Sequence, residues 1–162
     1  MLYLSTRDAS VKVSSATAIA QGISNEGGLF VPESIPTLSC ADFKRIAELD
    51  YIGRAKEVLK LYLTDFTEEE LEFCVNGAYN GTFENNQPAP LYKLDKGEYI
   101  LELWHGPTCA FKDMALQLLP YLLTTAAGKT VKDKTIVILV ATSGDTGKAA
   151  LEGFKDVPGT KI

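Results

Sequence analysis

One lysine lies in a stretch of sequence that is otherwise mostly uncharged. Lys112 follows a Gly-Pro-Thr turn at 106–108 and precedes a long apolar segment, 114–127, which predicts a buried helix. The helix dipole opposes a cation at this end of a helix, and burial also disfavours the charged form. Both effects favour a neutral amine that can attack a carbonyl carbon, as a Schiff-base lysine does. The alternative is an ordinary lysine that reaches solvent and pairs with a nearby acid.

A second stretch predicts a ligand site. An apolar, largely β-branched run at 134–141 predicts a strand buried on both faces, as in a parallel sheet. A glycine-rich turn, 142–147, follows it and leads into another helix. Ligands bind at the carboxyl ends of such strands, where backbone N–H groups at the next helix N-terminus receive anions. The alternative for this turn is an ordinary helix cap, made by Ser143 or Asp145.

The two stretches together resemble the threonine synthase family, whose members are fold-type-II enzymes that use pyridoxal 5'-phosphate (PLP). The family's His-Gly-Pro-Thr-x-Ala-Phe-Lys-Asp motif matches 105–113, and its Ala-Thr-Ser-Gly-Asp-Thr-Gly loop matches 141–147. The amino-terminal signature also fits, with Ser-Thr-Arg at 5–7 and Gly-Gly-Leu-Phe-Val-Pro-Glu at 27–33. The departures, Asp8 and the Ser-Ser-Ala at 14–16, do not touch the expected chemistry.

The resemblance implies a cofactor, a substrate and a set of site residues. PLP would form a Schiff base with Lys112, whose amine then acts as general base beside the substrate Cα. The substrate would be O-phospho-L-homoserine, converted with water to L-threonine and phosphate. Lys112, Phe111 and Asp113 are assigned to the cofactor site, although an acid in a first helical turn is stabilising in any case. The residues assigned to substrate binding are His105, Thr108, Thr142, Ser143, Gly144, Asp145 and Thr146.

The composition of the chain indicates which kinds of partner and location to expect. The 162 residues include 16 basic and 21 acidic side chains, which argues against a nucleic-acid partner. The single histidine and three dispersed cysteines indicate neither a metal site nor a disulfide framework, and reduced thiols fit a cytosolic protein. No apolar run approaches the length that spans a membrane. We therefore expect a cytoplasmic protein with a small-molecule substrate, no metal and no membrane partner.

The order of elements predicts an α/β fold in two parts. Residues 1–80 are expected to form a small, mainly helical lobe with short edge strands, and 81–90 a linker. Residues 91–162 are expected to begin a parallel-sheet, PLP-binding domain of fold type II. A hairpin is expected at 91–103, a helix break at Pro120 and a helix end at Gly128.

Other functions fit less well. An amino-acid dehydratase or a β-replacing synthase shares the fold, but the sequences Phe-Lys-Asp and Ser-Gly-Asp-Thr-Gly resemble those of threonine synthase more closely. The segment 142–149 resembles a nucleotide-binding P-loop, yet Thr142 replaces its first glycine and Ala149 replaces the hydroxyl that holds Mg²⁺.

A non-catalytic chain is the third alternative. Threonine synthases are much longer, and the residues that bind the PLP phosphate and the pyridine nitrogen are expected beyond Ile162. We therefore expect an amino-terminal fragment that is weak or inactive alone and that self-associates through the surface left exposed.

Overall fold

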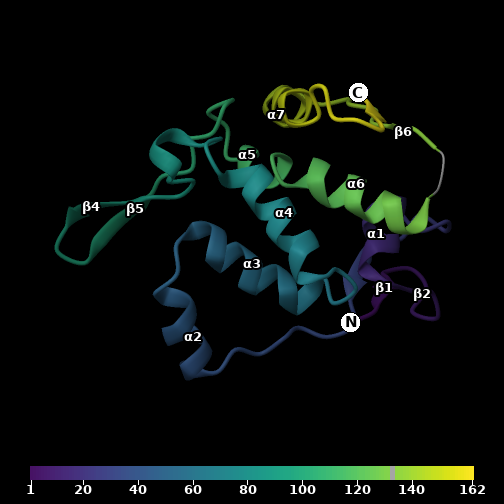
Figure 1. The fold of residues 1–162 in the computed structure, drawn as a ribbon, viewed down its shortest axis with the longest axis horizontal. Helices are drawn as coiled ribbons and strands as arrows, with labels where there is room; N and C mark the ends of the chain where they lie inside the picture. The colour runs from purple at the N-terminus through teal and green to yellow at the C-terminus, as the bar shows by residue number, and fades with distance from the viewer. Residues whose placement is uncertain (132–133) are drawn as a thin grey trace. The chain divides into compact units, whose positions relative to one another are not determined.

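The computed structural model describes residues 1–131 and 134–162 (Figure 1). The chain divides into two compact units that alternate along the sequence. The first comprises Met1–Cys74 and Leu122–Lys134, and the second comprises Val75–Tyr121 and Thr135–Ile162. The expected boundaries at 80 and 90 concern the domains of a whole enzyme and stay a prediction. Within the described part of the chain, no helix has the length and apolar content needed to cross a membrane.

The first unit begins with a small antiparallel sheet. Its central strand pairs with the other two in the order β2-β1-β3. The expected short strands are present, but the expectation that they are edge strands is wrong for β1, because strands pair with it on both sides. The strands are β1 (Tyr3–Ser5), β2 (Lys12–Val13) and β3 (Phe30–Pro32). The helices that begin in this unit are α1 (Ser15–Gln21), α2 (Cys40–Ala47), α3 (Tyr51–Tyr62) and α4 (Glu68–Tyr79).

Polar caps define where two of these helices begin. Ser39 and Asp42 form a reciprocal capping box at the start of α2. Thr67 and Glu70 do the same for α4, because each side chain accepts the other's backbone N–H, at 3.2 and 2.7 Å. Each box satisfies helix N–H groups that have no partner within the helix.

Asp65 joins the start of α1 to the segment before α4. Its carboxylate accepts the Ser15 hydroxyl and the Ala16 N–H, the latter at 3.0 Å. Burial by itself would raise the pKa of Asp65, but these hydrogen bonds outweigh burial and lower the pKa below its ordinary value. The charged carboxylate therefore stabilises α1 at neutral pH.

The second unit contains the segments that carry the predicted chemistry. A hairpin of β4 (Leu91–Asp95) and β5 (Glu98–Leu101) confirms the expected hairpin. Strand β6 (Ile136–Val137) pairs with β7 (Thr160–Lys161) in parallel, as expected for this fold class. The helices of this unit include η1 (Glu84–Asn86), α5 (Asp113–Leu116) and α7 (Asp145–Gly153), and α6 (Leu119–Thr130) begins here.

The apolar segment after Lys112 forms two helices. The turn residues Gln117 and Leu118 separate α5 from α6, and Pro120 is the second residue of α6, where its missing N–H leaves no hydrogen bond unmade. The expected break at Pro120 is confirmed. The expected end at Gly128 is wrong, because α6 continues to Thr130. A helical glycine costs only about 1 kcal/mol, and the Lys129 ammonium is held by the Glu70 carboxylate.

The inner strand is shorter and more exposed than expected. Strand β6 has two residues, and the side chains of Val137 and Leu139 are 63% and 91% exposed. Within the described residues, β6 pairs with β7 alone. A strand is buried on both faces only where other elements cover both faces, so burial of the 134–141 run depends on more than its own sequence.

Replacing Asp65 tests its role at α1. Asp65→Asn removes the charge and one of two acceptor oxygens, so the free energy of unfolding at pH 7 should fall by about 1–2 kcal/mol. Urea unfolding measures this change, with the exposed Glu48→Gln as the matched loss of charge. Because the folded-state pKa of Asp65 is lowered, its contribution is lost as the pH falls through that value. Equal stability of Asp65→Asn and Glu48→Gln would contradict this role.

Candidate active site

The lysine turn is held by one buried carboxylate. Asp113 is fully buried at the start of α5, and its two oxygens accept the Thr108 N–H and the Thr108 hydroxyl, each at 2.8 Å. Thr108 is only 6% exposed. Asp113 therefore does more than favour the helix dipole, because it closes the turn that precedes Lys112.

Gly106 makes this closure possible. A Cβ at position 106 would lie 2.5 Å from Asp113 Oδ2 and 2.6 Å from Asp113 Cβ, which no side chain could accept. The turn also places the exposed Cys109 at a φ of 58°, in the left-handed region. The shape of the turn is thus set by close contact with Asp113.

Lys112 is half-buried and lies at the end of this turn. Its carbonyl accepts the N–H groups of Ala115 and Leu116, at 3.2 and 2.9 Å, so its backbone is fixed to α5. Its Nζ lies 4.7 Å from the centre of the Phe111 ring. Among the described residues, no carboxylate forms an ion pair with this amine. The alternative expectation, an ordinary lysine paired with an acid, therefore finds no support in these residues.

Two further contacts fix α5. The Tyr79 hydroxyl donates to the Met114 carbonyl at 2.8 Å, and Tyr79 itself is buried beside Phe83. On another side, a Cβ at Gly153 would lie 2.2 Å from the Leu116 carbonyl oxygen, so the backbone of α7 directly contacts α5. The base of Lys112 is therefore held by packed elements rather than by a loop alone.

Thr142 organises the glycine-rich loop. Its hydroxyl accepts the N–H groups of Gly144 and Gly147, at 3.3 and 2.9 Å. Gly144 is the N-cap of α7 and has a φ of 149°, which favours glycine. The alternative expectation, in which Ser143 or Asp145 caps this helix, is wrong, because the cap hydrogen bonds come from Thr142.

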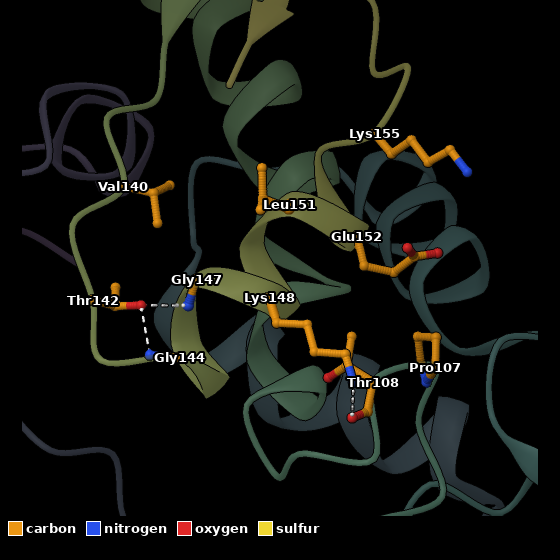
Figure 2. Close-up of a pocket in the computed structure, with 10 residues that line it drawn as sticks. All are labelled: Pro107, Thr108, Val140, Thr142, Gly144, Gly147, Lys148, Leu151, Glu152 and Lys155. Atoms are coloured by element: carbon orange, nitrogen blue, oxygen red, sulfur yellow. Dashed lines mark hydrogen bonds between the residues drawn. The ribbon is translucent and has the colours of Figure 1, made fainter.

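The lysine turn and the glycine-rich loop line one open pocket of about 590 Å³ (Figure 2). Three segments contribute to it: the turn, the loop and one face of α7. The Lys148 Nζ donates to the Thr108 carbonyl at 3.1 Å and so links α7 to the turn. The lining residues are Pro107, Thr108, Val140, Thr142, Gly144, Gly147, Lys148, Leu151, Glu152 and Lys155.

Only part of the expected site lines this pocket. Thr108, Thr142 and Gly144 do so. The residues of the expected site that lie outside its lining are His105, Phe111, Lys112, Asp113, Ser143, Asp145 and Thr146. Sequence analysis missed the α7 face, although the spacing of Lys148, Leu151 and Glu152 at i, i+3 and i+4 indicates one side of a helix. Lys155 lies just beyond the end of α7.

His105 is held between two carboxylates. Its Nδ1 lies 3.0 Å from Glu84 and its Nε2 lies 2.7 Å from Glu102, while its ring stacks on Trp104. Hydrogen bonds to Glu84 and Glu102 raise the pKa of His105 above its ordinary value. The Glu84 N–H also donates to the His105 carbonyl, at 3.0 Å. His105 therefore anchors the entry to the lysine turn.

The His105 contacts predict a pH-dependent stability. Because the folded-state pKa of His105 is raised, its contribution is complete below about 6.5 and is lost as the pH rises through the raised value. Between pH 6 and pH 9, the free energy of unfolding, measured with urea, should fall by more in the unaltered chain than in His105→Gln. The same loss in both proteins would show that the two carboxylates contribute no such stabilisation.

Asp113→Asn tests the closure of the turn. Asparagine offers one acceptor oxygen and points an NH₂ group at the other Thr108 donor, so the free energy of unfolding should fall by about 1–3 kcal/mol. The exposed Asp156→Asn is the control, since asparagine also tolerates the positive φ at that position. Chemical unfolding of both variants gives the comparison, and an unchanged Asp113→Asn would count against the closure.

Known proteins resemble this chain over most of its length. Residues 2–79 match the family described as Threonine synthase N terminus. The chain is 38% identical over 161 residues to threonine synthase of Schizosaccharomyces pombe, covering 94% of this chain and 31% of that protein. It is 37% identical over 163 residues to human threonine synthase-like 1, covering 94% of this chain and 22% of that protein. The chain thus spans about a third or less of these curated relatives.

A comparison of structures identifies the same family as the comparison of sequences. A crystal structure of PLP-bound threonine synthase from Brucella melitensis superposes with a TM-score of 0.91 at 34% identity, covering all of this chain and 34% of that one. These likenesses place the chain in a PLP-dependent enzyme family. That family is threonine synthase, and the chain belongs to it as its amino-terminal portion.

Proposed function

We propose that this chain is the part of a threonine synthase that carries the cofactor lysine. The whole enzyme would be a carbon–oxygen lyase that converts O-phospho-L-homoserine and water to L-threonine and phosphate. One observation carries the proposal: the buried Asp113 carboxylate closes a turn that holds Lys112, and Thr108 of this turn lines the same pocket as the glycine-rich loop. A cytoplasmic location is part of the proposal and is supported by three free cysteines.

The surroundings of Lys112 fit PLP. An amine that reacts with an aldehyde must not be engaged by a carboxylate, and no described carboxylate pairs with Lys112. Phe111 provides an aromatic surface beside the amine, and Asp113 fixes the backbone on which the amine is carried. PLP, when bound, supplies an electron sink for the charge that develops at the substrate Cα.

The residues of this chain bind the substrate and move its protons. Lys112 Nζ takes the proton from the substrate Cα and later returns it, as a general base held at a fixed position. Thr108 forms part of the pocket wall. The loop of Thr142, Ser143, Gly144, Asp145 and Thr146 binds the substrate carboxylate at the N-terminus of α7. His105 contributes by anchoring the turn between Glu84 and Glu102, and Asp113 contributes in the same way from the other end.

The alternatives have weaker support. A P-loop needs a first glycine and a hydroxyl that holds Mg²⁺, and this chain has Thr142 and Ala149 at those two positions. A dehydratase or a β-replacing synthase would share the lysine, but the relatives at 37–38% identity are threonine synthases and threonine synthase-like proteins. Formation of L-threonine and phosphate in equal amounts from O-phospho-L-homoserine distinguishes a threonine synthase from these.

Labelling of the lysine tests the proposal in the full-length enzyme. Borohydride reduction after addition of PLP should attach the cofactor to Lys112, and Lys112→Ala should lose this label together with threonine formation, by a factor of about 10²–10⁴ or more. Peptide mapping by mass spectrometry locates the label. Lys96→Ala, in the exposed hairpin turn, should keep both properties. A label on Lys148 or Lys134 would refute the assignment.

A further inference from the structure

Thr108 is held from two directions. Asp113 accepts its N–H and its hydroxyl from within the lysine turn, and Lys148 donates to its carbonyl from α7. All three polar groups of one nearly buried residue are thus engaged, as Figure 2 shows for the bond to Lys148. Thr108 is therefore the point at which the lysine turn and α7 meet.

Helix α7 is itself firmly placed. Thr142 caps its N-terminus through the Gly147 N–H, at 2.9 Å. At its other end, Gly153 allows direct contact with the Leu116 carbonyl oxygen, since a Cβ there would lie only 2.2 Å away. The helix therefore contacts α5 at one end, and Lys148 connects the other end to the turn before α5.

We propose that Lys148 is a positioning residue for the reaction at Lys112. Its ammonium, bonded to the Thr108 carbonyl, holds the lysine turn and the glycine-rich loop at a fixed separation, so that the amine and the anion-binding N–H groups face one substrate. This inference rests on the proposed function. A hydrogen bond from a charged donor to a carbonyl is strong enough for this role, and an arginine at the same position can replace it.

The position of Lys148 agrees with this role. Lys148 is exposed and lines the open pocket, yet its ammonium has a protein partner. Here its nitrogen is within hydrogen-bond distance of a carbonyl that belongs to the lysine motif, 40 residues earlier in the sequence. Because both ends of the link lie in one compact unit, its loss would loosen the turn within that unit.

Three variants of the full-length enzyme test the proposal. Lys148→Met removes the donor and keeps the aliphatic stem, Lys148→Arg keeps a donor, and Lys96→Met removes a lysine from the exposed hairpin turn. Two quantities are measured: kcat and KM for O-phospho-L-homoserine, and the rate at which the cofactor-free enzyme incorporates PLP, followed by absorbance. The second quantity needs no turnover, so it tests the link even if the proposed substrate is wrong.

We expect Lys148→Met to lower kcat by about 2- to 10-fold with little change in KM, and to slow PLP incorporation by a similar factor. Lys148→Arg should recover most of both, and Lys96→Met should change neither. A raised KM with unchanged kcat and unchanged PLP incorporation would mean that Lys148 binds substrate directly, which overturns the proposal. No change in either quantity would overturn it as well. Should Lys148→Met fail to fold, Lys148→Leu, which also lacks a donor, gives the same comparison.

Discussion

A fully buried carboxylate must find hydrogen-bond donors nearby, and this requirement shapes the site. Asp113 meets it with two donors from a single residue, the N–H and hydroxyl of Thr108. The chain can reach this arrangement only because Gly106 leaves room for the carboxylate. The turn is therefore defined by its own polar contacts, and the backbone of Lys112, the N-cap of α5, has a fixed position. A reactive amine needs such a support, because small displacements of a catalytic group are costly in rate.

The second segment is held in an equivalent way. Thr142 caps α7 with its hydroxyl, and Gly147 permits the close approach. Segments about thirty residues apart in sequence thus become two walls of one pocket, with α7 as the third. The proposed function requires this proximity, because it assigns Lys112 and the glycine-rich loop to one substrate. Lys112 and the glycine-rich loop each lie at the N-terminus of a helix, and packing keeps these helices in place.

Sequence analysis succeeded where the determinants are local. The hairpin around 95–97 and the break at Pro120 each follow from residue types a few positions apart. The motif at 105–113 likewise identified the family before any geometry was known. Analysis from sequence failed where distant contacts decide. Leu139 is 91% exposed because burial of a strand depends on neighbouring elements, and α6 passes Gly128 with Lys129 held by the Glu70 carboxylate. The bond from Lys148 to Thr108 has no local signature at all.

The amide hydrogen of Thr108 reports most directly on the closure of the lysine turn. Its exchange with solvent deuterium can be followed by NMR in the 162-residue chain. Although Thr108 lies in a turn, its N–H is buried against Asp113, so it should exchange at least about 100-fold more slowly than the exposed amide of Ser143. Exchange of the two amides at similar rates would show that Asp113 does not hold the turn, and that Lys112 is not fixed in the way described.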